Sequence, residues 1–190
     1  MCVTNLVLFD SEATYSVSGM GRPQPGEGDL RSTVRRVVTG HDSDGHAVVW
    51  LDDEAGNVRS SSPGLSSTLL WATEGSPATF VGDEDAGSWS LGTMPPPGGS
   101  RFLVLRLAPG SGKTRMHRTD TLDYVVCLSG EMTLWLDESS VTLRAGDVAV
   151  QRGTNHCWEN RADVETAIVV AMLDGRPKRD GSLVAGQVAG

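Results

Sequence analysis

Between residues 101 and 173 the chain repeats one pattern, in which a short run of β-branched and other apolar residues is followed by a polar or glycine-containing turn. Runs of about five to eight residues with a turn roughly every 8 to 12 residues are typical of an antiparallel β-sandwich or a small barrel. No segment carries the apolar periodicity of an amphipathic helix longer than about two turns. We therefore predict an all-β fold, with strands over residues 101–107, 124–128, 132–136, 141–143, 148–150 and 166–173.

The preceding region predicts a β-hairpin. Two β-rich runs, residues 36–39 and 47–51, flank a turn with an Asp-Gly pair, which supplies the positive φ that a tight hairpin requires. His41 and His46 flank the same turn beside two aspartates. Because this turn lacks the bidentate acid and the spacing of a calcium loop, we interpret these histidines as surface residues of the hairpin.

Changes in composition divide the chain into four segments. They are a flexible N-terminal arm at residues 1–33, a β-hairpin and strand extension at 34–100 that packs on the barrel, the barrel at 101–175, and a tail at 176–190. Within the extension, residues 52–67 are polar and turn-rich, and residues 67–72 predict another strand. The weak, glycine- and proline-containing character of the arm also allows a natural start at Met20.

Charge and composition exclude several classes of protein. The 190 residues include 24 acidic and 16 basic ones, for a net charge of −8, which argues against binding nucleic acid or an anionic membrane surface. No apolar run approaches the roughly 18 to 20 residues of a spanning helix, and the first ten residues do not form a secretory signal. Cys2, Cys127 and Cys157 are too few and too scattered for a disulfide framework, and Cys127 is interpreted as a buried apolar residue. We expect a cytoplasmic protein.

Three residues of the β-rich region stand out as candidate chemistry. His117 and Asp123 are an even number of positions apart, so strand-like backbone would place both on one face. His156 follows 39 residues after His117, beyond several further predicted strands, far enough for a neighbouring strand to bring it opposite His117. Two imidazoles and a carboxylate that converge in this way would form a facial site for a divalent first-row metal.

The residues around these positions resemble the two motifs of the cupin superfamily. Residues 112–131 are similar to the first motif, a glycine followed by His-x-His, three residues and Glu, and then a strand that ends in glycine. Residues 145–160 resemble the second motif, with Gly153, His156 and Asn160 in register. The resemblance implies a small conserved-barrel (cupin 2-like) protein, a double-stranded β-helix or jelly-roll barrel with the site in its lumen.

Carried over residue by residue, the resemblance implies that His117, Asp123 and His156 ligate one divalent metal ion, Fe, Mn, Ni or Zn, and act as the catalytic residues. Thr119 stands where the first motif has its second histidine, and Asp123 stands where the motif has glutamate. A neutral hydroxyl is a poor metal ligand, so we expect a weaker site with an additional open position. On the residues alone, His117 could instead be a core histidine paired with Asp123, and Asp123 a turn residue bound by backbone N–H groups.

Four residues are candidates for substrate binding: Thr119, Gln151, Trp158 and Arg106. Trp158 shares strand parity with His156 and is expected to point inward, where it could wall a flat substrate. An inward Arg106 would suit a carboxylate or phenolate. By the same parity Tyr124 is expected to point outward.

The leading functional interpretation is a metal-dependent enzyme acting on a small oxygenated organic molecule, with a dioxygenase favoured. Similarity to cupins found beside secondary-metabolite pathways suggests an aromatic or polyketide-like substrate. Alternatives are a decarboxylase or other lyase, an isomerase or sugar epimerase that uses His117 and Asp123 as an acid–base pair, and a metal-free cupin that binds a small molecule. We expect no nucleic-acid or membrane partner, and a homodimer formed through the N-terminal strands.

Overall fold

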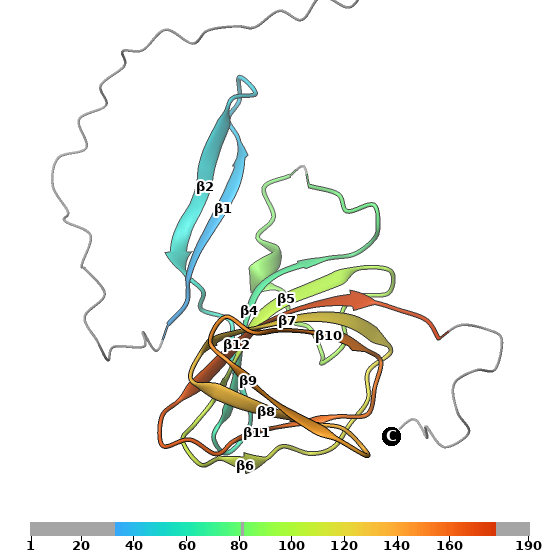
Figure 1. The fold of residues 1–190 in the computed structure, drawn as a ribbon. Coiled ribbons are helices and arrows are strands. Elements are labelled where there is room, and N and C mark those ends of the chain that lie inside the picture. The colour runs from blue at the N-terminus through green and yellow to red at the C-terminus, as the bar shows by residue number, and fades with distance from the viewer. Residues whose placement is uncertain (1–32, 81, 178–190) are drawn as a thin grey trace, which may run out of the picture. The chain divides into compact units, whose positions relative to one another are not determined.

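The computed structural model describes residues 33–80 and 82–177 (Figure 1). The predicted start at Met20, nearly all of the predicted arm and most of the predicted tail lie outside these residues. The described part contains twelve strands and one short 3-10 helix. They are β1 (Arg35–His41), β2 (Ala47–Glu54), β3 (Val58–Ser62), β4 (Leu65–Thr73), η1 (Ala86–Ser88), β5 (Ser100–Leu107), β6 (Gly112–Lys113), β7 (Thr121–Ser129), β8 (Glu131–Trp135), β9 (Ser140–Arg144), β10 (Val148–Arg152), β11 (Cys157–Asn160) and β12 (Thr166–Asp174).

The strands form three antiparallel sheets. The largest has six strands in the order β10-β7-β12-β5-β4-β3, the second has four in the order β6-β11-β8-β9, and β1 pairs with β2. Figure 1 shows the four-stranded sheet facing the part of the six-stranded sheet that contains β7, β10 and β12. The prediction of an all-β fold is confirmed.

The main core lies between the two larger sheets, and both contribute to it. Its buried members are Leu103, Leu107, Val125, Cys127, Met132, Leu134, Leu143, Trp158, Ile168, Val170 and Met172. Strand β7 shows how one strand contributes to this core: its alternate residues from Thr121 to Cys127 are buried, whereas Tyr124 is 49% exposed. The outward direction predicted for Tyr124 and the buried position predicted for Cys127 are confirmed.

The predicted hairpin is β1–β2, and its turn contains Gly45 with a φ of 82°. Arg36 of β1 is buried and binds groups both within the hairpin and outside it. Its guanidinium donates to both carboxylate oxygens of Asp53 and of Asp85 and to the carbonyl of Leu70 on β4. Arg36 therefore connects β2, β4 and the cap of η1.

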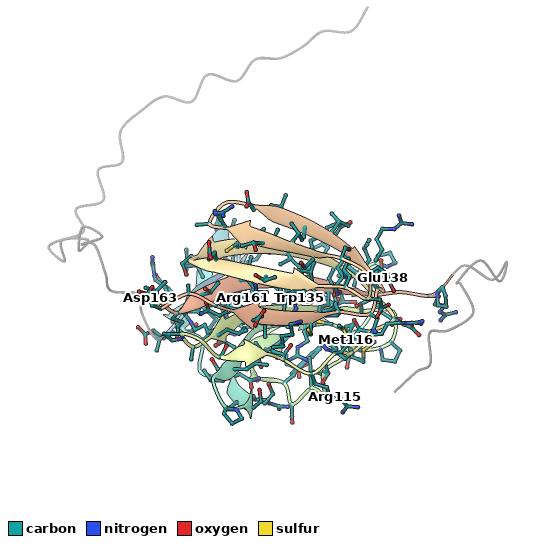
Figure 2. All side chains as sticks on the ribbon, turned by 60° about the horizontal axis from the view of Figure 1, so that its bottom comes forward. Arg115, Met116, Trp135, Glu138, Arg161 and Asp163 are labelled. Atoms are coloured by element: carbon teal, nitrogen blue, oxygen red, sulfur yellow. The ribbon has the colours of Figure 1, made fainter. Side chains whose placement is uncertain are left out.

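The outward face of the four-stranded sheet carries a cation–π cluster (Figure 2). The Nζ of Lys113 lies 3.4 Å from the centroid of the Trp135 ring, and the guanidinium carbon of Arg161 lies 5.0 Å from it. The Trp135 indole donates to Glu159, which also accepts from Arg161. These contacts connect β6, β8 and β11, which carry one side of the site.

Three strands lie outside the predicted ranges: β3, the two-residue β6 and β11. Residues 52–67 were expected to be polar and turn-rich, whereas residues 58–62 form β3, which pairs with β4 at the edge of the six-stranded sheet. All five β3 residues are exposed, so the strand lacks the alternation that identifies a half-buried strand. Within the described part of the chain, no helix is long and apolar enough to cross a membrane.

Candidate functional site

His117 and His156 lie side by side across the interior of the barrel. Each residue donates its backbone N–H to the carbonyl of the other, at 2.9 and 2.8 Å, in an isolated antiparallel bridge. The centroids of the two rings are 4.3 Å apart. His156 immediately precedes β11 and is buried, whereas His117 is partly exposed. The predicted approach of the two histidines is thus present in the structure.

Both imidazoles are held in the same tautomer. The Nδ1 of His117 lies 3.0 Å from the carbonyl oxygen of Arg115, and the Nδ1 of His156 lies 2.9 Å from that of Thr154. A carbonyl oxygen only accepts hydrogen bonds, so each Nδ1 carries a proton. With its proton on Nδ1, each ring has Nε2 as the atom that can offer a lone pair to a metal ion.

Asp123 and Gln151 face each other on β7 and β10 beside the histidines. They are direct cross-strand partners, and the Nε2 of Gln151 donates to Oδ2 of Asp123 at 2.8 Å. The same Nε2 lies 3.3 Å from Nε2 of His156. The remaining oxygens, Oδ1 of Asp123 and Oε1 of Gln151, are buried without a hydrogen-bond partner. Buried acceptors without a donor are costly, so a positive group close to either oxygen would be stabilised.

Burial sets the protonation of this group. It raises the pKa of Asp123, although hydrogen bonds from Thr121 and Gln151 and the charge of His117 act in the opposite direction. Burial lowers the pKa of His156 to about 4, and the neighbouring charge of His117 adds to that effect. His156 is therefore neutral at physiological pH, with its Nε2 lone pair available.

Two of the predicted substrate-binding residues lie close to this group. The hydroxyl of Thr119 is 2.8 Å from that of Thr121, and Thr121 acts to lower the pKa of Asp123. The ring of Trp158 is buried, with its centroid 6.1 Å from that of His156 and the two planes at 75°. Trp158 therefore points inward, as its parity with His156 predicts.

The structure does not bring Arg106 to this group. Arg106 pairs across strands with Ala167, which packs with Val104 in a separate cluster on the other face of the six-stranded sheet. Its guanidinium binds Glu165 at 2.8 Å. Alternate residues of β5, Leu103 and Leu107, fill the barrel core instead.

Whether these residues fit a metal ion depends on the positions and the chemistry of their donor atoms. Within residues 33–80 and 82–177, no group of three or more His, Cys, Asp or Glu side chains stands in position to hold one. The chemistry of the donor set nevertheless fits, because the Nδ1 contacts of His117 and His156 leave Nε2 of each ring as the coordinating nitrogen, and Asp123 offers an oxygen without a partner. The amide of Gln151 lies between Asp123 and His156, where a shared ion would lie.

Residues of the second motif have structural roles that hold the site. Asn160 is fully buried, and its Nδ2 donates to the carbonyls of Leu107, Ala108 and Val164. Gly153 has a φ of 59°, in the left-handed region that glycine adopts without strain. Gly153 precedes the segment that carries His156 and Asn160 ends it, and both fix the backbone path of that segment.

Sequence reasoning missed Thr121, which connects Thr119 to Asp123 through two hydroxyl contacts. The available signal was parity, because residues 119, 121 and 123 are alternate positions on strand-like backbone. The hydrogen bond between Asp123 and Gln151 was also missed. The two residues are 28 positions apart in the chain and meet only through the register of β7 and β10.

Comparison with known proteins agrees with this fold and these motifs. The family model described as "Cupin domain" matches residues 103–172. "Phomopsin biosynthesis cluster protein C'" of Diaporthe leptostromiformis is 36% identical over 176 residues, which cover 88% of this chain and 93% of that protein. The "cupin-domain-containing oxidoreductase virC" of Hypocrea virens is 32% identical over 158 residues, or 80% of this chain and 78% of that protein.

A shorter match concerns a 1-hydroxy-2-naphthoate 1,2-dioxygenase of Nocardioides. It is 33% identical over 73 residues, which cover 37% of this chain and 18% of that protein. The two longer matches, the family model and the barrel with its paired histidines agree on one assignment. The chain belongs to the cupin superfamily, as a small conserved-barrel protein of the secondary-metabolism type.

Proposed function

We propose that this protein is a metal-dependent cupin oxidoreductase that acts on a small oxygenated aromatic or polyketide-like molecule, with dioxygenase chemistry. The observation that carries the proposal is the pair of adjacent histidines whose Nδ1 atoms are both bound to carbonyls, next to the buried Asp123 that Gln151 connects to His156. Relatives named as cupin-domain-containing oxidoreductases, at 29 to 32% identity, support the reaction class. The match to a dioxygenase of a hydroxylated aromatic acid supports the substrate class.

In this proposal His117, His156 and Asp123 hold one divalent metal, and the fixed tautomers remove the need to reorganise either ring on binding. A metal bound there would polarise an enolate, phenolate or carboxylate and, if it is redox-active, supply electrons for O₂ chemistry. Trp158 would form a flat apolar wall beside His156 and orient an aromatic ring. The surrounding core would exclude water from the reacting atoms.

The test uses full-length protein purified without chelator or affinity metal, with His156→Ala as the matched variant. We expect near one equivalent of a single metal in the wild type and its loss in the variant. Oxygen uptake on addition of 1-hydroxy-2-naphthoate or a related hydroxylated aromatic acid then tests the oxidative step. Metal retention without oxygen uptake, but with release of CO₂ or another cleavage product, would favour a lyase that uses the same ligands.

A second candidate is a metal-free cupin that binds a small molecule. The observation that favours it is the Gln151 amide, which donates to Asp123 and approaches His156 at the position that a metal would take. No metal in either protein, together with binding of a small aromatic acid that survives His117→Ala, would select this candidate and contradict the first.

A further inference from the structure

We propose that Gln151 is a fourth metal ligand, through Oε1, and that its amide turns over when the ion enters. This inference rests on the proposed metal-dependent function. It assigns to Gln151 the position that the first cupin motif gives to a second histidine, which is Thr119 in this chain. The argument combines the hydrogen bonds of Gln151, its unpartnered oxygen, and the distances from its amide to the neighbouring donors.

The hydrogen bonds show that the amide now occupies the place of a cation. Its NH₂ group offers two protons, and the two acceptors within reach are Oδ2 of Asp123, at 2.8 Å, and the lone pair on Nε2 of His156, at 3.3 Å. Asp123 and His156, the two residues that carry these acceptors, are both metal ligands in the proposed function. A cation that takes them would meet the positive end of the amide, so the NH₂ group has to leave.

The other end of the amide suits the cation. Oε1 of Gln151 is buried and has no hydrogen-bond partner, which leaves it as an unsatisfied acceptor. Rotation of the terminal torsion by about 180° exchanges Oε1 and Nε2 with little movement of the side chain. Oε1 would then lie about 3 Å from each of the two neighbouring donors. This spacing suits a shared ion, because two ligand atoms that each lie about 2.1 Å from one ion, roughly at right angles, are also about 3 Å apart.

The competing residue for the fourth position is Thr119. Its hydroxyl is 2.8 Å from the hydroxyl of Thr121, which bonds Asp123. Thr119 therefore acts on Asp123 through Thr121, as a positioning residue, and a neutral hydroxyl is a weaker donor to a divalent ion than an amide oxygen. Gln151 carries both the unpartnered oxygen and the direct contact to two candidate ligands.

The test titrates metal-free full-length protein with Co²⁺ and follows the visible absorption bands, which report the number and type of ligands. Gln151→Leu removes the amide, Gln151→Glu keeps an oxygen at the same reach but has no N–H to donate, and Arg152→Gln on the exposed opposite face of β10 is the matched control. We expect Gln151→Leu to change the Co²⁺ bands and to weaken binding by at least ~10-fold. Gln151→Glu should bind at least as tightly as the wild type, and Arg152→Gln should match the wild type in bands and affinity.

Co²⁺ bands of Gln151→Leu that superimpose on the wild type would overturn the inference, whatever happens to affinity. So would a Gln151→Glu variant that binds as weakly as Gln151→Leu, because an N–H donor that only positions Asp123 cannot be replaced by a carboxylate. If Gln151→Leu does not fold, Gln151→Glu still decides, since exchange of an amide ligand for a carboxylate shifts the bands at unchanged or higher affinity. A wild type that binds no Co²⁺ at all would instead overturn the proposed function itself.

Discussion

His117 and His156 exchange backbone hydrogen bonds at 2.9 and 2.8 Å although 39 residues separate them in the chain. The bridge brings the last residues before β11 against the segment before β7. It fixes the positions of the two rings through the backbone and requires no contact between side chains. The distance between the two imidazoles is therefore a property of the barrel backbone. Substitutions that loosen either segment should act on the site as strongly as substitutions within it.

Asn160 tests this dependence on the backbone. Its side chain donates to the carbonyls of Leu107, Ala108 and Val164 and accepts from the N–H of Ala162, all in a fully buried position. Asn160→Ala leaves these backbone groups unpaired, and we expect it to lower the free energy of unfolding by roughly 2 to 4 kcal/mol. Urea unfolding measures the loss. Asn155→Ala, which removes one exposed bond to Asp137, is the control and should cost about 1 kcal/mol or less.

Gly130, between β7 and β8, provides a second test of a tight backbone position. Its φ is 68°, and an added Cβ would stand 2.6 Å from Oγ1 of Thr166 and 3.1 Å from the carbonyl of Glu165. Gly112 has a similar φ of 70° but nothing within 4 Å of the added Cβ. We expect Gly112→Ala to cost about 1 to 2 kcal/mol from conformation alone, and Gly130→Ala to cost clearly more. Thermal unfolding of both variants separates the two contributions, and equal losses would contradict the steric argument.

Arg36 should be irreplaceable by lysine. Its guanidinium binds Asp53 and Asp85 with two bonds each and also the carbonyl of Leu70, a geometry that one ammonium group cannot reproduce. We expect Arg36→Lys to lower the free energy of unfolding by roughly 1 to 3 kcal/mol, because both carboxylates keep partial access to water. Arg35→Lys changes only an exposed pair with Asp52 and should be near neutral. Denaturant titration of the two variants side by side would show whether they differ.

The free energy of unfolding of the metal-free protein should depend on pH through His156. Its pKa in the folded protein is about 4, against an ordinary value of 6.5, because it is buried. As pH falls from about 6.5 to 4, the unfolded chain binds a proton that the folded site excludes, so the metal-free protein should lose stability by up to about 1.4 kcal/mol per pH unit. The raised pKa of Asp123 acts in the opposite direction, because the folded state binds that proton more readily. His156→Gln should show a shallower loss over this window, and equal slopes in urea unfolding would contradict the assignment.

A homodimer remains our expectation for the oligomeric state. The β1–β2 hairpin exposes Val37 at 50% and Val49 at 60%, and β3 leaves an open strand edge on the six-stranded sheet. Light scattering at micromolar concentration should give twice the mass of the chain. A monodisperse monomer would contradict the expectation, and a dimer that Val49→Asp dissociates would assign the hairpin to the interface.

The sequence predicts those parts of the molecule whose pattern is local. The hairpin at Gly45 follows from its Asp-Gly turn, and the inward and outward residues of β7 follow from alternation, because β7 has one buried face. Arg106 shows where alternation fails: β5 is central in its sheet, with Val104 buried on one face and Leu103 and Leu107 on the other. Apolar residues on both faces leave no signal for which one is the barrel interior.

In the candidate site, too, the sequence predicts some residues and leaves others to the three-dimensional structure. The two histidines could be selected from motif spacing, since each lies in a segment that carries its own turn residues. The amide of Gln151 could be placed only after the register of β7 and β10 was known, because a shift of one residue would have turned it outward. The relay from Thr119 through Thr121 to Asp123 likewise depends on hydroxyl orientations that alternation does not specify.

Each imidazole donates its Nδ1 hydrogen bond to the carbonyl two residues earlier in the chain, that of Arg115 for His117 and that of Thr154 for His156. Choice of tautomer is therefore encoded within a tripeptide and needs no distant partner. Such a three-residue unit could be transferred to another protein. A barrel that reproduces its conformation at the start of a strand would present a histidine whose Nε2 faces a metal ion, whatever residues fill the rest of the interior. The interior of this barrel is correspondingly free to diverge toward new substrates while its histidines keep their chemistry.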